Sequence, residues 1–141
     1  RVIFQTYNPE MYAIKNAKAQ NYIDFYNNEI HRREMFDYPP FSQIIKIVVS
    51  SNNEERAKKC TEEIADNFQN QIEKLGLSEH IEVNGAMPCI MHKINMEYRY
   101  QIIIKNKLSK KGQYIVSTFF KKCSVSSDIK AVIDIDPVDV I

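Results

Sequence analysis

The residues of this chain best suited to binding a ligand lie in one strand-like segment, residues 98–105. Successive side chains of a strand point to opposite faces. One face carries Tyr98, Tyr100, Ile102 and Ile104, and the other carries Arg99, Gln101, Ile103 and Lys105. An arginine can donate paired hydrogen bonds to a phosphate, a glutamine adds neutral ones and a lysine adds a point charge. The second face therefore suits contact with phosphate, unless it is the ordinary solvated face of an antiparallel sheet.

This segment lies within a basic part of a nearly neutral chain. Between residues 92 and 122, eight Lys or Arg residues accompany one acid, Glu97, which gives a local excess of +7, whereas the whole chain has a formal net charge of +1. The basic residues are Lys93, Arg99, Lys105, Lys107, Lys110, Lys111, Lys121 and Lys122. Uneven charge of this kind can attract a polyanion when the total charge cannot. In an alternative arrangement, Tyr98 and Tyr100 are exposed and stack on unpaired bases.

Length and composition fit one globular domain with a short additional element. The chain has 141 residues, of which 44% are hydrophobic and 26% charged, and this is enough to bury a core. Its apolar runs suit strands and are far shorter than the roughly 20 residues of a membrane span, so we expect a soluble protein. The cysteines, at positions 60, 89 and 123, lack zinc or dithiol spacing, which favours reduced thiols and a cytoplasmic location. The start at Arg1, without an initiator methionine or signal peptide, suggests a fragment of a larger protein.

The sequence contains no motif for catalysis. With three glycines it has no Gly-Lys-Thr loop, so we expect neither ATPase activity nor a cofactor in this chain. The serines at 124–127 lack the Gly-x-Ser-x-Gly context of a hydrolase. Residues that could bind a metal are scattered: His31, His92 and Cys89, and the strand-end acids Asp134, Asp136 and Asp139. We expect no metal site.

Periodicity predicts the elements that must position these residues. Residues 1–5 read as a strand, followed by a turn in which Asn8 caps a helix and Pro9 takes its first position. Helices are predicted at 11–20 and 21–35, and Tyr38-Pro39-Pro40 ends them. Strands are then predicted at 41–50, 81–91, 98–105 and 131–136, with a hairpin connection at 95–97. Helices are predicted from Asn52 or Asn53 to Leu75, ended by Gly76, and at 110–122, where Ile115, Val116 and Phe119 are expected to be buried.

The order β-α-β-β-α-β predicts an α+β fold of the ferredoxin-like, split βαβ type. Such a fold has a four-stranded antiparallel sheet with two helices on one face. Here it would span residues 41–141 behind a short helical connector that ends near residue 40. The second face of the sheet is left uncovered, and several nucleic-acid-binding modules use such a face.

Three segments together resemble the C-terminal part of the primosomal protein N′ family of bacterial replication-restart DNA helicases. They are Arg1-Val2-Ile3-Phe4-Gln5-Thr6-Tyr7-Asn8-Pro9-Glu10, then Glu34-Met35-Phe36-Asp37-Tyr38-Pro39-Pro40-Phe41, and finally Tyr98-Arg99-Tyr100-Gln101-Ile102-Ile103-Ile104-Lys105 with the closing Ile133-Asp134-Ile135-Asp136-Pro137. They occur in the order of the family, so the resemblance covers essentially the whole chain. One departure lies at the hairpin turn, where Glu97 stands in place of a base that is usual in the family.

The resemblance implies a non-catalytic part of an ATP-dependent 3′-to-5′ DNA helicase. The ATP-binding and zinc-binding parts would lie upstream of Arg1, and residues 1–40 would be the end of the second motor lobe and the connector. In that family the C-terminal domain helps to recognise branched DNA at stalled forks, so we expect fork or branched DNA as a partner, with phosphates positioned by Lys93, Arg99 and Lys105. The predicted DNA-binding residues are Lys93, Tyr98, Arg99, Gln101, Lys105 and Lys107.

Two other functions fit the same basic segment. The first is a protein-interaction module that docks the acidic tail of single-stranded DNA-binding protein, a partner that the resemblance also implies. Its predicted residues are Lys110, Lys111 and Ile115, a basic rim beside an apolar position. The second is a small-molecule-binding domain of the same fold, which would need an enclosed pocket.

Overall fold

The computed structural model describes residues 2–138 of the chain. The chain divides into two compact units, Arg1–Asp37 and Tyr38–Ile141. In the first unit, α1 spans Tyr12–Ala19 and α2 spans Tyr22–Met35, so both predicted helices are confirmed. Asn21 caps α2, because its side-chain oxygen accepts a hydrogen bond from the backbone N–H of Asp24 at 3.2 Å.

The helices of the first unit are joined by polar contacts of Glu29. Its carboxylate accepts hydrogen bonds from the hydroxyl of Tyr12 on α1 and, at 2.7 Å, from Nε of Arg33. The Tyr12 hydrogen bond, followed by that of Arg33, lowers the pKa of Glu29 from its ordinary value. Neither helix contains a fully buried residue, so this unit has no core of its own among the described residues.

Of the predictions for the first ten residues, the turn is confirmed, whereas the strand and the helix start at Asn8 and Pro9 are wrong. Residues 2–6 form no strand, and Val2 and Ile3 are 80% and 79% exposed. A strand needs a hydrogen-bonded neighbour, and no strand pairs with this segment in the described part of the chain. Asn8 and Pro9 lie in a turn that precedes the helix, whose N-cap is Met11.

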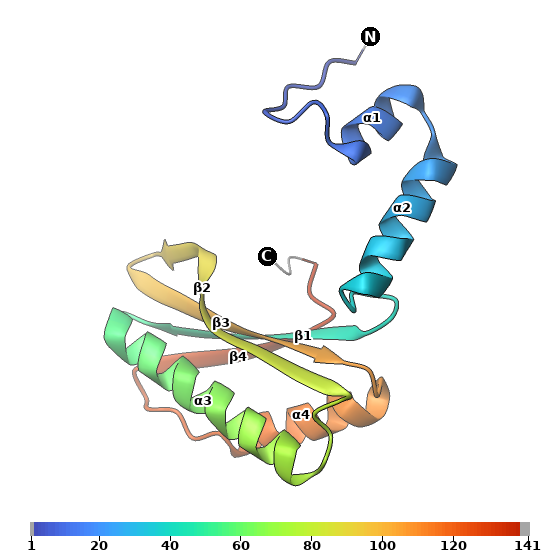
Figure 1. The fold of residues 1–141 in the computed structure, drawn as a ribbon. Helices are drawn as coiled ribbons and strands as arrows, with labels where there is room; N and C mark the ends of the chain where they lie inside the picture. Colours follow the sequence, from blue (N-terminus) through green and yellow to red (C-terminus); the bar gives the residue numbers. More distant parts are fainter. Residues whose placement is uncertain (1, 139–141) are drawn as a thin grey trace. The chain divides into compact units, whose positions relative to one another are not determined.

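The second unit has the predicted ferredoxin-like fold (Figure 1). Its elements are β1 (Gln43–Ser51), α3 (Glu54–Lys74), β2 (Ile81–Ile94), β3 (Glu97–Asn106), α4 (Lys110–Lys122) and β4 (Ile129–Ile135). The strands form one antiparallel sheet in the order β2-β3-β1-β4. Figure 1 shows α3 and α4 on the same face of this sheet. The predicted α+β class and element order are therefore confirmed.

The ends of α3 follow from the residues that flank it. The side chain of Asn53 accepts a hydrogen bond from the backbone N–H of Arg56 at 3.0 Å, and Glu54 adds negative charge at the positive end of the helix. At the other end, Gly76 has φ +66°. The N–H of the following residue, Leu77, donates to the carbonyl of Ile72 at 3.0 Å, which completes a Schellman motif.

The helices cover one face of the sheet and form the core there. Alternate residues of the two central strands, β1 and β3, point into it and are completely buried, as β periodicity requires. The core cluster consists of Ile45, Ile47, Val49, Ile64, Ala65, Phe68, Ile72, Ile81, Ile102, Ile104 and Val116. Phe119 packs against this cluster, and Ile115 is half-buried, so the predicted apolar side of α4 is confirmed in its main part.

A buried polar residue sets the start of α4. Asn106, 1% exposed, donates to the carbonyl of Ser109 at 2.7 Å and accepts from the N–H of Leu108 at 2.9 Å. It also donates to the side-chain oxygen of Gln43 on β1 at 3.1 Å. Gly112, in the first turn of α4, leaves room for this amide, because a Cβ there would lie 1.8 Å from Asn106 Oδ1.

Strand β2 is irregular at two places. Its register with β3 shifts between Asn84 and Met87, and again between Pro88 and Lys93. In the second irregularity, residues 89–92 stand opposite Arg99 alone, because Pro88 pairs with Tyr100 and Lys93 with Tyr98. Bulges of this kind bend a strand and re-aim its side chains.

Residues 2–138 contain no helix with both the length and the apolar character needed to cross a bilayer. Among the same residues, no three His, Cys, Asp or Glu side chains gather as metal ligands would. Asp139 lies outside the described residues.

Candidate nucleic-acid interface

The strand register brings three polar residues into one row on the face opposite the helices. Ser50 of β1 pairs with Arg99 of β3 on one side and with Lys130 of β4 on the other. Residues directly opposite each other share a face, with Cβ atoms about 5 Å apart. Arg99, Ser50 and Lys130 therefore form a line across three strands that are distant in sequence. We call it the cationic row.

This row forms part of a hollow of about 600 Å³ on the uncovered face. We call it the sheet hollow. It is lined by Lys46, Val48, Ser50, Ile94, Asn95, Glu97, Arg99, Lys130, Val132, Asp134 and Val138. Three bases and two acids thus line it, and its charge is weakly positive at neutral pH. Such a surface suits an anionic ligand more than a cationic or strongly apolar one.

The charged groups of the sheet hollow differ in their partners. Neither Arg99 nor Lys130 forms an ion pair with a carboxylate of residues 2–138. Asp134 stands directly opposite Lys46 in the register of β1 and β4. The carboxylate of Glu97 accepts a hydrogen bond from the Ser50 hydroxyl at 3.0 Å. Within the described part of the chain, two cations without a carboxylate partner therefore lie on either side of a serine that already binds a carboxylate.

Only part of this face is open, which corrects the expectation of an uncovered sheet face. Ile44 and Ile103 point away from the helices and are nevertheless buried. Gln101, predicted to contact DNA from an exposed position, is only 4% exposed. It lies on the central strand β3 between Val48 of β1 and Met87 of β2. The prediction that Gln101 is a surface residue is wrong, because its side chain lies buried between its cross-strand neighbours on the same face, Val48 and Met87.

The second irregularity of β2 helps to close this part of the face. It begins at Cys89, which is buried, and the charges of Arg99 and Lys46 both act on its thiol. Burial raises the pKa of the Cys89 thiol, while these two cations favour the thiolate and oppose that rise. Cys89 therefore lies close to two of the bases that line the sheet hollow.

Tyr98, Tyr100 and Lys93 lie on the other side of β3 from Arg99. Tyr100 is 8% exposed, and its hydroxyl donates to Glu54 Oε1 at 3.3 Å. Burial and the Glu54 charge raise the pKa of Tyr100. The alternative in which Tyr98 and Tyr100 form an exposed pair is therefore wrong. Lys93 lies 4.3 Å from the centre of the Tyr98 ring, and its Nζ donates to the Tyr98 hydroxyl at 2.9 Å.

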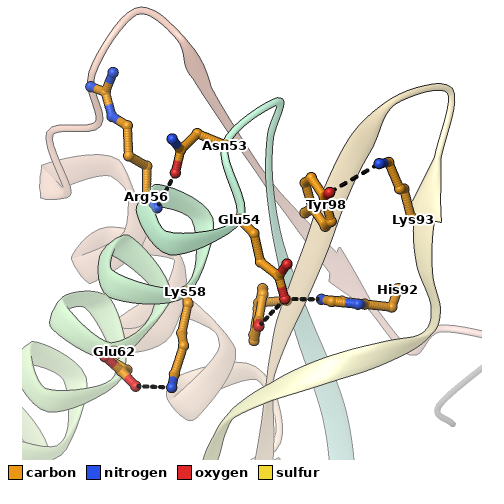
Figure 2. A network of polar contacts seen from close by, with 9 residues as sticks. Asn53, Glu54, Arg56, Lys58, Glu62, His92, Lys93 and Tyr98 are labelled. Atoms are coloured by element: carbon orange, nitrogen blue, oxygen red, sulfur yellow. Dashed lines mark hydrogen bonds and ion pairs between the residues drawn. The ribbon is translucent and has the colours of Figure 1, made fainter.

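These contacts hold the β2–β3 hairpin against the start of α3. Figure 2 shows Glu54 of α3 directed at His92 of β2, with Lys93 and Tyr98 paired nearby. His92 Nε2 lies 3.5 Å from Glu54 Oε1, and its ring meets those of Tyr98 and Tyr100 edge-on. Because Ile94, Asn95 and Glu97 at the end of the hairpin line the sheet hollow, this network also fixes one wall of that hollow.

Lys105 and Lys107 lie away from the sheet hollow. Lys105 points to the same face as Arg99 but is six residues further along β3, about 20 Å at the usual rise per residue. Its Nζ lies 3.7 Å from Glu82 Oε2 and 5.1 Å from the centre of the Tyr38 ring. Lys107 lines a second hollow, of about 370 Å³, together with Pro39, Pro40, Phe41, Ser42, Gln43, Asn106, Ser109 and Asp136. Of the six predicted DNA-binding residues, only Arg99 lines the sheet hollow.

The three residues predicted to receive a partner tail all lie on α4. Lys110 and Lys111 are exposed in its first turn, and Ile115 is half-buried one turn later. None of the three lines the sheet hollow or the hollow beside Lys107. The structure thus brings them near one another on one helix, without joining them to the cationic row.

Lys46 and Lys130 were not predicted as site residues. Both are single bases within apolar strands, at positions that alternate with core residues, so their orientation was readable from the sequence. The sequence feature that could have located them is the ferredoxin-like strand order, which places β1 between β3 and β4. Lys46 and Lys130 both lie outside the basic segment 92–122.

Comparison with known proteins identifies the family. The family model described as "Primosomal protein N C-terminal domain" matches residues 34–138, about three quarters of the chain. The chain belongs to this family. The resemblance carried by the three sequence segments is thereby confirmed.

Relatives of this family domain are named "Replication restart protein PriA". The protein of that name from Borreliella burgdorferi (strain ATCC 35210 / DSM 4680 / CIP 102532 / B31) is 40% identical over 141 residues, which cover 99% of this chain and 20% of the relative. That from Chlamydia muridarum (strain MoPn / Nigg) is 28% identical over 97% of this chain and 18% of the relative. That from Bacillus subtilis (strain 168) is 34% identical over 75% of this chain and 12% of the relative. The chain thus spans about a fifth or less of the length of these relatives.

Proposed function

We propose that this domain binds the sugar–phosphate backbone of fork or branched DNA through the sheet hollow, and so positions a replication-restart helicase. The observation that carries the proposal is the cationic row, in which Arg99 and Lys130 flank Ser50 and have no carboxylate partner within residues 2–138. Family membership supports replication restart as the setting. The domain itself is non-catalytic in this proposal, and the ATPase motifs belong to other parts of a longer protein.

The chemistry of the row suits phosphates rather than bases. Arg99 can donate two parallel hydrogen bonds to phosphate oxygens, Ser50 can donate one and Lys130 adds a mobile positive charge. Contacts of this type fix the register of a protein on DNA without reading its sequence. A domain that must act at forks of any sequence needs this kind of recognition.

The partners and location follow from the same proposal. Upstream helicase lobes would be joined to residues 1–37, whose exposed Val2, Ile3 and Phe4 offer an apolar surface for packing. DNA bound to the sheet hollow would hold these lobes at the branch while they hydrolyse ATP. The location would be the bacterial cytoplasm, at the nucleoid.

Fluorescence anisotropy tests the DNA contact. The 141-residue chain is titrated onto labelled fork, duplex and single-stranded DNA at a series of salt concentrations, beside Arg99→Ala. We expect binding that favours the fork, weakens with salt because counterions are released, and is about tenfold weaker in Arg99→Ala, which loses a charged hydrogen-bond donor. Lys59→Ala is the matched control, because it removes one charge from the exposed surface of α3. Equal binding by Arg99→Ala and Lys59→Ala would contradict the proposal.

A second candidate, docking of the acidic tail of single-stranded DNA-binding protein, is favoured by the hollow beside Lys107. That hollow combines Lys107 with the apolar surfaces of Pro39, Pro40 and Phe41, which suits a peptide with an acidic residue and an apolar end, although Asp136 also lines it. Titration of such a peptide into the DNA complex separates the candidates. Competition would indicate one shared site, and a ternary complex would indicate two. The same peptide is also titrated into variants in which one of the predicted residues, Lys110, Lys111 or Ile115, is replaced by alanine.

A further inference from the structure

We propose that Glu97 is a built-in competitor for phosphate, whose carboxylate holds the Ser50 hydroxyl of the cationic row until DNA displaces it. The inference rests on the proposed DNA contact and adds a regulatory residue to that site. It explains how a hollow with three bases can remain nearly neutral when no DNA is bound.

The position of Glu97 is the first step of the argument. Its Oε2 lies 3.0 Å from the hydroxyl of Ser50, the central residue of the row. Ser50 is 8% exposed, so its hydroxyl has little access to water, and Glu97 provides the acceptor. Glu97 and Arg99 are two apart on β3 and point to the same face. The carboxylate therefore takes the hydrogen-bond donor at the centre of the row, although it forms no ion pair with Arg99 or Lys130.

The charges around this carboxylate form the second step. Lys130 and Arg99 stand on either side of Ser50, and neither has an ion pair within residues 2–138. Lys46 lies farther along β1, opposite Asp134. A carboxylate and a phosphodiester each carry one negative charge and repel each other strongly at short distance. The same hydroxyl cannot serve both, so a phosphate on Ser50 requires Glu97 to leave.

The third step is that Glu97 is able to leave. It is exposed and is the first residue of β3, directly after the turn formed by Asn95 and Met96. Its backbone remains paired with Ile94, so rotation of the side chain into solvent breaks no strand pairing. An exposed contact of this kind contributes little to stability. A phosphate of bound DNA can therefore displace it at little cost to the fold.

Substitution of Glu97 tests the inference by two readouts, DNA affinity and its salt dependence. Glu97→Gln removes the charge and changes the lining of the hollow from three bases against two acids to three against one. We expect the variant to bind labelled fork DNA about fivefold more tightly at low salt, with a log–log salt slope steeper by about 0.9, the value for one additional phosphate contact. Glu63→Gln is the matched control, because it removes one exposed acid from α3.

A second variant separates charge from hydrogen bonding. Glu97→Asp keeps the charge but shortens the side chain, so its salt slope should remain close to that of the parent. Thermal unfolding followed by circular dichroism verifies that each variant is folded.

The possible outcomes distinguish a failure of the competitor role of Glu97 from a failure of the proposed DNA contact. A tighter complex and a steeper slope in Glu97→Gln, but not in Glu63→Gln, support competition. If the parent binds too weakly for a slope to be measured, measurable binding by Glu97→Gln but not by Glu63→Gln supports it. Equal curves for Glu97→Gln and Glu63→Gln overturn the competitor role and leave the DNA contact intact if Arg99→Ala still weakens binding. If neither the parent nor Glu97→Gln binds any DNA, both the competitor role and the proposed function are overturned.

Discussion

The two faces of the sheet use the same strands for different purposes. On the helix-covered face, Ile45, Ile47 and Ile102 are completely inaccessible to solvent. On the other face, Ile44 and Ile103 are buried at one end, whereas Arg99 and Lys130 line the sheet hollow at the other end. Because side chains alternate along a strand, neighbouring residues such as Ile47 and Lys46 belong to different faces. Substitutions on the first face should therefore change folding, and substitutions on the second should change binding.

Removal of a core aromatic residue should have the largest effect on the covered face. Phe68 of α3 is 1% exposed, and its ring meets that of Phe119 edge-on with centroids 6.0 Å apart. Phe68→Ala should lower the free energy of unfolding by about 3–5 kcal/mol, because it leaves a cavity between the helices and the sheet. Urea unfolding measures this. Tyr114→Ala, at a position 74% exposed on α4, should change it by less than about 0.5 kcal/mol. A similar loss in both would contradict the assignment of Phe68 to the core of the covered face.

A single methyl group at the start of α4 should have the next largest effect. Gly112→Ala would place a Cβ 1.8 Å from Asn106 Oδ1, and the displaced amide would lose its hydrogen bonds. We expect a loss of about 2 kcal/mol in the free energy of unfolding. Gly76→Ala is the control, because a Cβ there meets no atom within 4 Å and only the positive φ is strained. Should Gly76→Ala prove the more damaging, the role assigned to Asn106 would be wrong.

A substitution on the open face should affect binding without affecting folding. Lys130→Ala should reduce the log–log salt slope of DNA binding by about 1, equally for all DNA sequences, because a phosphate contact carries no base information. The free energy of unfolding should change by less than about 0.5 kcal/mol, since Lys130 is exposed and lies outside the core. Anisotropy and urea unfolding provide the two measurements. An unchanged salt slope would exclude Lys130 from the interface.

The smallest effect should appear in the chemistry of the cysteines. Burial raises the pKa of the thiols of Cys60 and Cys89. At any pH below the raised pKa, the folded protein therefore holds less of the reactive thiolate than the unfolded chain does. Alkylation of the folded protein should be correspondingly slower. Arg99 opposes the rise at Cys89. Arg99→Ala should therefore slow iodoacetamide labelling of Cys89 and leave Cys60 unchanged, as measured by mass spectrometry. Faster labelling of Cys89 in the variant would show that access, rather than charge, controls its rate.

The helices and the strand order were predictable because their signals are local. Asn53 and Gly76 mark the ends of α3 in the sequence, and the apolar stripe between them has a clear helical period. The four strands show apolar periodicity, and their order with the helices is sufficient to indicate the ferredoxin-like fold. The strand predicted at residues 1–5 failed, because a strand depends on a partner that its own residues do not specify.

The candidate site was predictable only in part, because it depends on register. Arg99 was identified from its own strand, but Lys46 and Lys130 join it only through the pairing of β1 with β3 and β4. The burial of Gln101 likewise follows from flanking strands and from a β2 whose register shifts twice. Hydrophobic patterns do not encode such shifts, and charge clustering along the sequence grouped Lys93 and Lys105 with Arg99, although neither lines the sheet hollow.

The two irregularities of β2 also determine how this domain meets other copies of itself. β2 is an edge strand, and a straight edge with a regular row of free N–H and C=O groups is a template for pairing with another sheet. Here the row is interrupted at each register shift, and Pro88 has no N–H to offer. An incoming strand would find no continuous ladder along this edge. The register shifts of β2 thus act against edge-to-edge aggregation along this strand.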